Sequence, residues 1–290
     1  MGGGGYSVSS RHARAENEGY YTKSANETFS QRGIFHEMNP YGVTLRESRD
    51  SDEHPDAYPI IIALDVTGSM GQIPHELVRN GLPTIMSNII SSGIQHPQVL
   101  FLAIGDHECD RSPLQIGQFE SSDEKLDYWL TNVYLEGGGG GNLGESYALA
   151  WLFASRYTET DSFAKRGRKG VLITIGDEPT LNDYSARMQK ALFGDGQCSD
   201  ATASSLLADA CQSYHCFHLN TSFTMSGRRT NTVNKWRELM SDHLLIAESI
   251  DEISAIISKT VEDCFLSETK ETPAEKRINP VINNIDDIIL

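Results

Sequence analysis

The chain has 290 residues, 39% of them hydrophobic, and a formal net charge of −16, so it can form one large domain with tails or two small domains. The excess of carboxylates argues against binding nucleic acid through its phosphates, which needs a basic surface. No apolar run approaches the ~20 residues that span a bilayer, and the opening MGGGGYSVSS resembles neither a secretory nor a myristoylation signal. We therefore expect a cytoplasmic protein that binds neither nucleic acid nor membranes.

Residues 1–57 are polar and rich in turn-forming residues, with few apolar side chains. A segment of such low hydrophobicity cannot supply a core of its own. We interpret it as a Gly/Ser-rich N-terminal arm that is either a loose tail or ordered by docking onto the rest of the chain. Its aromatic residues would support the docked form, and they are Tyr20, Tyr21, Phe29, Phe35 and Tyr41.

From residue 58 the pattern changes to apolar runs of strand length that alternate with stretches of helical periodicity. Continuous apolar runs are typical of strands buried on both faces. We predict strands at 59–65, 99–104, 170–175, 214–219 and 244–247, with a further short strand at 132–135. We predict helices at 74–89, 123–131, 143–156, 201–211, 233–240 and 250–266.

This alternation predicts an α/β domain over residues 58–266, with a doubly wound, mainly parallel sheet and helices on both faces. Pro74 suits the first turn of its helix, and Pro83 should kink the same helix near its middle. The glycine run at 137–141 is expected to be a loop. Residues 267–290 are interpreted as a charged C-terminal tail.

Oxygen-bearing side chains follow the first predicted strand, where the sequence reads IIIALDVTGSM. Asp65 ends the strand, and Thr67 and Ser69 place two hydroxyls on the turn ahead of the helix. Ligands of open parallel sheets bind beyond the carboxyl ends of the strands, and a carboxylate with two hydroxyls suits a hard cation such as Mg²⁺. The alternative is that the hydroxyls only cap the following helix.

This segment resembles the Asp-x-Ser/Thr-x-Ser signature of the metal-ion-dependent adhesion site (MIDAS) of von Willebrand factor A (VWA) domains. The resemblance covers roughly residues 58–266. It implies a Rossmann-like VWA fold that holds Mg²⁺, or Mn²⁺ or Ca²⁺, at the head of the sheet. By position it also implies Asp177 as a ligand from the family's third loop, although this chain has Gly-Asp-Glu where the family often has Thr-Asp-Gly.

The second loop departs from the family pattern, which usually supplies a threonine after two glycines. Here five glycines are followed by the letters NLGES, so Asn142 stands near the threonine's place and could offer a carbonyl oxygen, cap the helix, or do both. Glu145 follows one turn later. An acidic residue after the glycines resembles the VWA subset found beside alpha-kinases, and Asp106 and His107 after the second strand fit the same subset.

Charge balance decides what such a site attracts. A divalent ion facing only Asp65 and Asp177 is neutralised and keeps a position for a partner's carboxylate. If Asp106 or Glu145 is an extra ligand, the site is over-neutralised, and it would then be structural or would favour a neutral or basic group. If Asp106 lies in the outer shell instead, it orients the ligands. The sequence leaves these arrangements open.

The resemblance therefore favours a non-enzymatic, metal-dependent protein-binding module with no catalytic residue. It also implies a partner class, because intracellular domains of this type often accompany MoxR-type AAA+ ATPases. One alternative is a phosphoester hydrolase that uses the same carboxylates, although no His or Lys is placed as a base and no phosphate loop is present. Another is a structural or assembly protein with a vestigial site.

Five scattered cysteines give neither a disulfide framework nor a zinc ribbon. Cys211, His215, Cys216 and His218 do cluster in the sequence. The strand at 214–219 is apolar enough that we interpret these residues mainly as core and strand positions rather than metal ligands.

Overall fold

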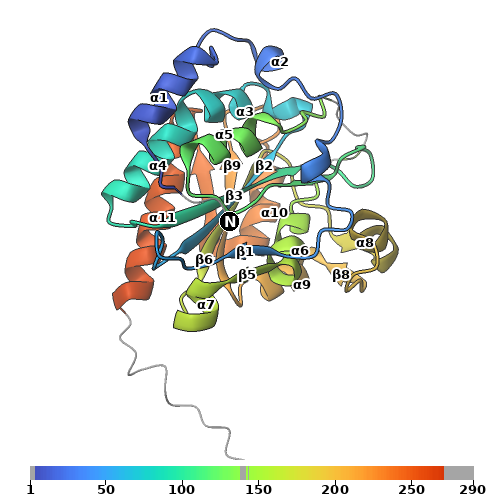
Figure 1. Cartoon of the computed structure of the whole chain (residues 1–290). Coiled ribbons are helices and arrows are strands. Elements are labelled where there is room, and N and C mark those ends of the chain that lie inside the picture. The colour runs from blue at the N-terminus through green and yellow to red at the C-terminus, as the bar shows by residue number, and fades with distance from the viewer. Residues whose placement is uncertain (1–3, 138–141, 143, 271–290) are drawn as a thin grey trace, which may run out of the picture.

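A computed structural model describes residues 4–137, 142 and 144–270. In this part of the chain a six-stranded sheet has the order β10-β9-β6-β2-β3-β4 and is covered by helices (Figure 1). All neighbouring strands are parallel except β4, which is antiparallel to β3. The strands of this sheet are β2 (Tyr58–Asp65), β3 (Pro97–Ile104), β4 (Leu114–Ile116), β6 (Gly170–Gly176), β9 (Tyr214–Thr221) and β10 (Leu244–Ala247). The predicted α/β class and doubly wound, mainly parallel sheet are confirmed.

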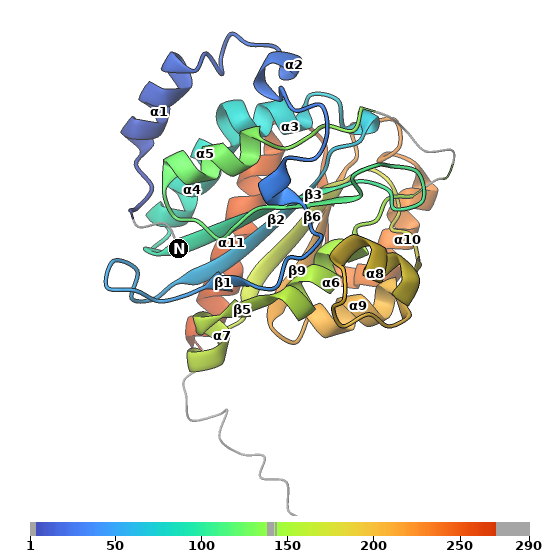
Figure 2. The ribbon, with the colours of Figure 1, turned by 45° about the vertical axis from the view of Figure 1, so that its right-hand side comes forward.

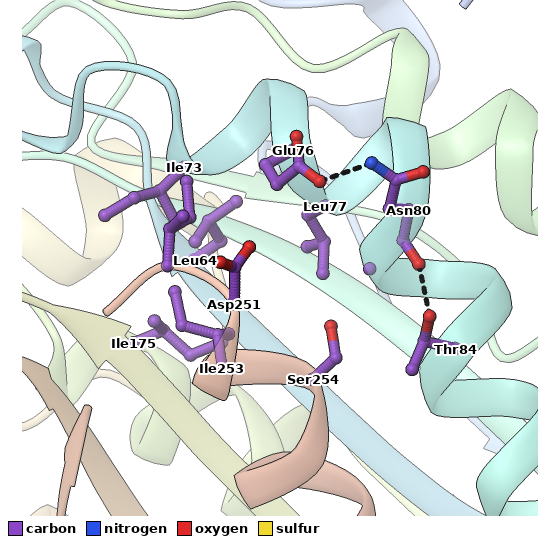
Figure 3. Close-up of a pocket in the computed structure, with 12 residues that line it drawn as sticks. Leu64, Ile73, Glu76, Leu77, Asn80, Thr84, Ile175, Asp251, Ile253 and Ser254 are labelled. Carbon is purple, nitrogen blue, oxygen red and sulfur yellow. Dashed lines mark hydrogen bonds between the residues drawn. The ribbon is translucent and has the colours of Figure 1, made fainter. Parts of the chain in front are cut away.

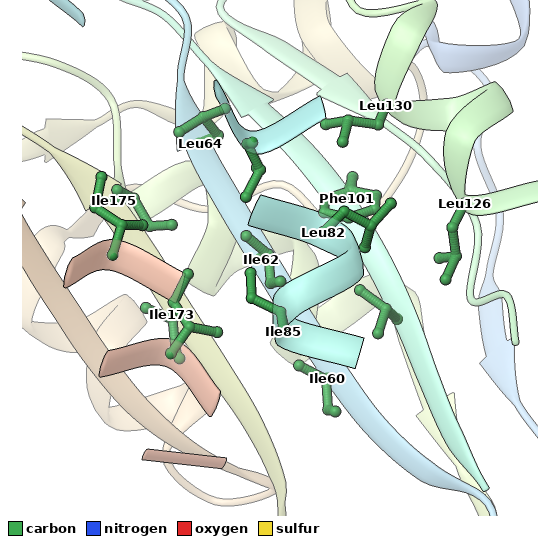
Figure 4. Packing of buried hydrophobic residues seen from close by; sticks show 14 of the residues in the cluster. Ile60, Ile62, Leu64, Leu82, Ile85, Phe101, Leu126, Leu130, Ile173 and Ile175 are labelled. Atoms are coloured by element: carbon green, nitrogen blue, oxygen red, sulfur yellow. The ribbon is translucent and has the colours of Figure 1, made fainter. Parts of the chain in front are cut away.

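The sheet has helices on both faces, and its central strands β2, β3 and β6 are buried at every position. Ile60 and Ile62 of β2 pack into one core, and Ile61 and Ala63 into the other, as the two-residue period of a strand requires. The first core lies under α3 (Ile73–Glu76), α4 (Leu82–Ser91), α5 (Asp123–Thr131) and α11 (Glu252–Lys270), and Figure 4 shows its centre. The second lies under α6 (Ala148–Tyr157), α8 (Ala186–Phe193), α9 (Ala203–Ala210) and α10 (Thr230–Met240).

The order of the strands fixes where a ligand site can lie. From β2 the chain proceeds to β3 and β4 on one side of the sheet, and then returns to β6 on the other side of β2. The strand order therefore reverses between β2 and β6, and ligands of doubly wound sheets bind beyond the carboxyl ends of the strands at such a switch point. The residues at these two ends are Asp65 and Gly176.

The N-terminal arm lies docked on the domain. Its helix α1 (Val8–Asn17) runs beside α4 and α5 in both views (Figures 1 and 2). Farther along, β1 (Arg46–Ser48) pairs in parallel with β5 (Thr158–Thr160), and the guanidinium of Arg166 in α7 (Asp161–Arg166) binds Asp50 at 2.8 Å. The arm also includes α2 (Ala25–Thr28) and a 3-10 turn at His36–Met38.

The helix after β2 is interrupted, as Pro83 predicts. Between α3 and α4 the backbone widens into a π-helical segment, Leu77–Gly81, in which the Leu82 N–H donates to the Leu77 carbonyl. Pro83 has no N–H to give to the next carbonyl, that of Val78. The buried guanidinium of Arg11 from the arm donates to the Val78 oxygen instead. The docked arm thus satisfies a backbone group that the helix leaves open.

Several predicted boundaries are wrong. Residues 132–135 do not form a strand, because the Gln115 side chain binds both the N–H and the carbonyl of Tyr134 in place of a neighbouring strand. The helix predicted from residue 143 begins at Ala148, because the backbone of Glu145 is bonded to the loop around Thr180. Helix α11 extends to Lys270, into the predicted tail. Residues 138–141 of the loop predicted at 137–141, residue 143 and the tail from residue 271 lie outside the described residues.

The sequence did not predict the short pieces of structure at the edges of the domain. These are β1, β4, β5, α2, α7, α8 and the antiparallel pair β7 (Asp183–Tyr184) and β8 (Ala201–Thr202). Further 3-10 turns occur at Gly68–Met70 and Ser241–His243. Among the residues that the structure describes, each helix is too short or too polar to cross a membrane.

Candidate metal-binding site

Asp65 lies at the carboxyl end of β2 and is completely buried. Its Oδ1 accepts hydrogen bonds from the backbone N–H of Thr67 at 2.9 Å and from the Thr67 hydroxyl at 2.7 Å. An aspartate commonly binds the backbone two residues further on, so the local sequence itself folds the loop around this carboxylate. The result is a buried carboxyl group at the switch point.

The loop continues the row of oxygen atoms to the next strand. The Thr67 and Ser69 hydroxyl oxygens are 3.3 Å apart, and the Ser69 hydroxyl donates to Asp177 Oδ1 at 2.8 Å. The Thr67 side chain does not cap the 3-10 turn Gly68–Met70, and the N-cap residue of the following helix α3 is Gln72, which disfavours the interpretation of Thr67 and Ser69 as helix caps alone. Gly71 ends the turn with φ of +52°, a conformation that favours glycine. The structure thus brings Asp65, Thr67, Ser69 and Asp177 together.

Tyr147 contributes to the site in a way that the sequence did not predict. It falls in the apolar stripe of the predicted helix, yet its hydroxyl donates to Asp65 Oδ2 at 2.7 Å. The backbone of Gly176 lies so close to this hydroxyl that a Cβ at position 176 would be 1.8 Å from it. The tyrosine ring contacts His218, which stacks on Trp236 at a centroid distance of 3.4 Å. This buried aromatic layer fixes Tyr147 and therefore one oxygen of Asp65.

Glu145 reaches the site from the second loop. Its N–H donates to the Pro179 carbonyl, and its carbonyl accepts from the Leu181 N–H, both at 2.9 Å. The loop approaches closely because residue 144 is glycine, whose added Cβ would lie 2.9 Å from Leu181 Cδ2. These bonds place Glu145 beside the loop that carries Asp177, and its Oε2 is buried without a hydrogen-bond partner.

Asp106 follows β3 and is also buried. Its Oδ1 accepts from the Glu108 N–H at 2.8 Å, while its Oδ2 has no partner. The neighbouring His107 is held by Ser146, whose hydroxyl lies 2.7 Å from His107 Nδ1. The loop after the second strand is therefore tied to the second loop next to Glu145.

Burial and mutual repulsion govern the charges in this cluster. Burial raises the pKa of Asp65 to about 7, although the Tyr147 and Thr67 hydrogen bonds oppose the rise. Burial also raises the pKa of Glu145 to about 10, assisted by the negative charges of Asp65, Asp110 and Asp106. Protons or a cation must therefore offset the buried negative charge.

The cluster contains the types of donor atom that a divalent cation prefers. One oxygen each of Asp106, Glu145 and Asp177 is buried without a partner, and hydroxyls lie between Asp65 and Asp177. Hard cations prefer such carboxylate and hydroxyl oxygens. Over the described residues, no group of three or more His, Cys, Asp or Glu side chains is arranged to hold a metal, so the candidate donor set depends on the hydroxyls as well as on the carboxylates.

Asn142 is placed differently from the other candidate ligands. Its side-chain amide donates to the Glu108 carboxylate at 2.8 Å. Among the described residues, no hydrogen bond joins it to Asp65, Ser69 or Asp177. The structure thus places the Asn142 side chain with the loop after β3 rather than with the chain of oxygens.

A groove opens next to Ser69 and Asp177. Its volume is about 750 Å³, and its apolar lining includes Met70, Phe223 and Met225, whose side chain is 74% exposed. A smaller cavity of about 220 Å³ lies behind the site, between the π-helical segment and the start of α11 (Figure 3). Leu64 and Ile175 form its floor. The groove, rather than this cavity, leads outwards from the candidate ligands.

No profile of a known protein family and no curated protein sequence matches the chain. The pilus adhesin SpaC from Lactobacillus rhamnosus GG aligns with a TM-score of 0.48 and 12% identity over 75% of this chain and 31% of the adhesin. Proximal thread matrix protein 1 from the mussel byssus aligns with a TM-score of 0.44 and 10% identity over 72% and 48%. A von Willebrand factor type A structure from Catenulispora acidiphila aligns with a TM-score of 0.40 and 10% identity over 72% and 43%. The chain spans less than half of each of these structures.

Proposed function

We propose that the protein is a metal-dependent protein-binding module of the VWA type, in which a cation held in a MIDAS-like site contacts a group on a partner. The observation that carries the proposal is the continuous row of oxygens from Asp65 through Thr67 and Ser69 to Asp177. Its residues match the signature in the sequence, and they lie at the switch point where such sheets bind ligands.

Each residue has a defined role in this proposal. Asp65 and Asp177 supply the charge that neutralises a divalent ion such as Mg²⁺ or Mn²⁺, and the two hydroxyls supply neutral oxygens. Tyr147 orients Asp65 through the bond to its Oδ2. When bound, the cation acts as a Lewis acid that attracts an oxygen of the partner. The groove beside Ser69 has room for the partner chain around that oxygen.

Glu145 and Asp106 limit how acidic the partner group can be. Both carboxyls are buried at the site, and each one that is ionised would weaken the attraction for an outside carboxylate. The raised pKa of Glu145 means that this residue is protonated at neutral pH before an ion binds. A protonated Glu145 leaves the charge balance to the aspartates.

The partner class that we propose is the MoxR-type AAA+ ATPase implied by the sequence resemblance.

Metal binding and partner binding are tested on one set of proteins. Mn²⁺ affinity is measured by isothermal titration calorimetry for wild type, Asp65→Asn, Asp177→Asn and the exposed control Asp183→Asn. We expect one ion per chain, and a loss of affinity on the order of 100-fold in the two site variants alone, because each removes one ligand charge. Equal affinity in all four proteins contradicts the proposal.

The second part uses a purified MoxR-type ATPase from the same organism. We expect wild type and Asp183→Asn to capture it with Mg²⁺ but not with EDTA, and Asp65→Asn not to capture it in either condition. Metal-independent capture would favour the assembly protein with a vestigial site. Two Mn²⁺ ions per chain together with phosphoester turnover would favour the hydrolase.

A further inference from the structure

The loop at 222–229, between β9 and α10, holds a methionine out in solvent beside the candidate metal site. Met225 is 74% exposed, more than any other large apolar side chain in the described part of the chain. It borders the groove that Ser69 and Asp177 also line. Single exposed apolar residues are common on protein surfaces, so the meaning of this one depends on its surroundings.

The backbone that carries Met225 is fixed by hydrogen bonds. The side-chain amide of Asn220, at the end of β9, donates to the Gly227 carbonyl at 2.9 Å. The Thr224 hydroxyl donates to the Thr221 carbonyl and accepts from the Gly227 N–H, both at 3.0 Å. Residue 227 packs so closely that an added Cβ would lie 2.1 Å from the Thr221 carbonyl oxygen. The loop therefore presents Met225 from a preformed backbone, which lowers the entropic cost of binding a partner.

The apolar surface extends from Met225 into the groove. Phe223 is partly buried against the first core, as is Ile250 after β10, and both line the groove with Met225. Its volume of about 750 Å³ falls in the range of about 300–1,000 Å³ that is typical of ligand pockets. A methionine side chain adapts to apolar groups of different shape. The groove therefore suits a large apolar side chain.

Charged groups at the groove determine what can lie next to that side chain. Arg229 is 47% exposed, and its guanidinium is 3.5 Å from the Glu178 carboxylate. A guanidinium has five N–H donors, so it can bind a second carboxylate. The neighbouring Arg228 is also exposed, whereas Glu248 lines the groove with the opposite charge. A partner's carboxylate is therefore attracted to Arg229 and repelled by Glu248.

We propose that the groove binds a partner segment in which a large apolar side chain lies next to an acidic residue. The apolar side chain packs against Phe223 and Met225, and the carboxylate contacts Arg229. This inference deepens the proposed function, on which it rests, because the groove borders the candidate ligands. Arg229 supplies an attraction for a carboxylate that does not depend on how far Glu145 and Asp106 neutralise the ion.

The first experiment selects peptides for binding to the full chain. A display library of random dodecapeptides is selected on the immobilised protein with Mg²⁺ and, in parallel, with EDTA. We expect the peptides enriched with Mg²⁺ to carry Asp or Glu within two residues of Leu, Met, Phe or Trp. Enrichment of basic peptides, or no enrichment over the support alone, overturns the proposal.

The second experiment locates the enriched peptide on the protein by fluorescence polarisation. We expect Met225→Ser to weaken binding about 10-fold, because an apolar contact is lost. We expect Arg229→Gln to weaken it about 5-fold and to remove the preference for the peptide over its Asn or Gln analogue. Tyr41→Ser and Arg32→Gln are the matched controls, since both residues are exposed and lie outside the groove. Unchanged affinity in either groove variant overturns the contact assigned to that residue.

Mn²⁺ titration of the same variants separates the groove from the cation site. We expect Met225→Ser and Arg229→Gln to bind Mn²⁺ at least as tightly as wild type, because neither residue is a candidate ligand. Mn²⁺ binding without peptide enrichment overturns the groove proposal and does not contradict the metal site. Peptide binding in EDTA by a chain that binds no Mn²⁺ supports the groove and contradicts the proposed function. Concentration-dependent dimers that Met225→Ser abolishes would make a second copy the occupant and overturn the proposal.

Discussion

Both oxygens of Asp65 are fixed, one by Thr67 and the other by Tyr147. The next carboxyls are less well satisfied, since Glu145, Asp106 and Asp177 each keep a buried oxygen without a partner. Leaving a buried polar group unpaired costs about 1–3 kcal/mol. If the site binds a cation as we propose, this cost falls on the metal-free protein.

The substitution Glu145→Gln tests whether this buried carboxyl group lowers the stability of the metal-free protein. Because the pKa of Glu145 is raised above its unfolded value to about 10, the native state holds a proton that the unfolded state has released, and stability falls as pH rises above the unfolded value. In EDTA we expect the glutamine variant to be more stable than wild type by about 1–3 kcal/mol at pH 8. The gain should be smaller at pH 6. Urea unfolding at the two pH values measures it.

A glutamine variant that is less stable than wild type, or a gain in stability that does not grow with pH, would show that folding does not raise the pKa of Glu145. Glu124→Gln is the matched control, because Glu124 is exposed on α5. We expect it to change stability by less than about 0.5 kcal/mol.

The sequence predicted four of the candidate ligands because they follow strand ends, where a motif and a parallel sheet together fix the position. It did not predict Tyr147, because an apolar stripe does not reveal that one hydroxyl points at a buried carboxylate. It offered Asn142 as a ligand, a helix cap or both by counting from the glycines, and it did not predict that the Asn142 amide nitrogen donates to Glu108. The sequence therefore predicts which residues lie at the end of a strand. It does not predict where a loop side chain points, because that depends on tertiary contacts.

At the scale of elements, the long buried strands were predicted well because their apolar runs are unambiguous. The short strands β4, β5, β7 and β8 were missed, since two or three residues give no periodicity to detect. Pro83 correctly indicated an irregular helix after β2. It could not indicate that a residue of the arm would bind the carbonyl that the π-helical segment leaves open.

Arg11→Met tests whether α1 is a structural part of the domain. Arg11 is completely buried, forms an ion pair with Asp127 at 2.6 Å, and donates to the Val78 carbonyl. Methionine would leave that carbonyl unpaired and leave Asp127 to Arg14 alone. We expect a loss of about 2–4 kcal/mol in the free energy of unfolding, measured by urea denaturation.

The exposed Arg32 provides the control, and Arg32→Met should leave stability within about 0.5 kcal/mol of wild type. We also expect limited proteolysis to cut the arm of Arg11→Met sooner than that of wild type. If Arg11→Met is as stable and as resistant as wild type, the arm does not contribute to the fold in the way that these contacts imply.

At the scale of the whole molecule, the alternation of strands and helices was enough to predict a doubly wound sheet, because few other topologies bury apolar strands on both faces. The sequence left open whether the arm was docked or loose. That choice depends on single buried contacts such as Arg11 with Val78, which carry no local pattern. The length and net charge of the chain also do not predict what binds in the groove beside the site.

An anomalous difference map of crystals grown with Mn²⁺, recorded at the manganese edge, tests whether Asp65 and Asp177 share one cation. We expect one peak in contact with Asp65, Ser69 or Thr67, and Asp177, and no such peak in crystals of Asp177→Asn. A map in which this position stays empty while Mn²⁺ binds elsewhere on the chain would contradict it.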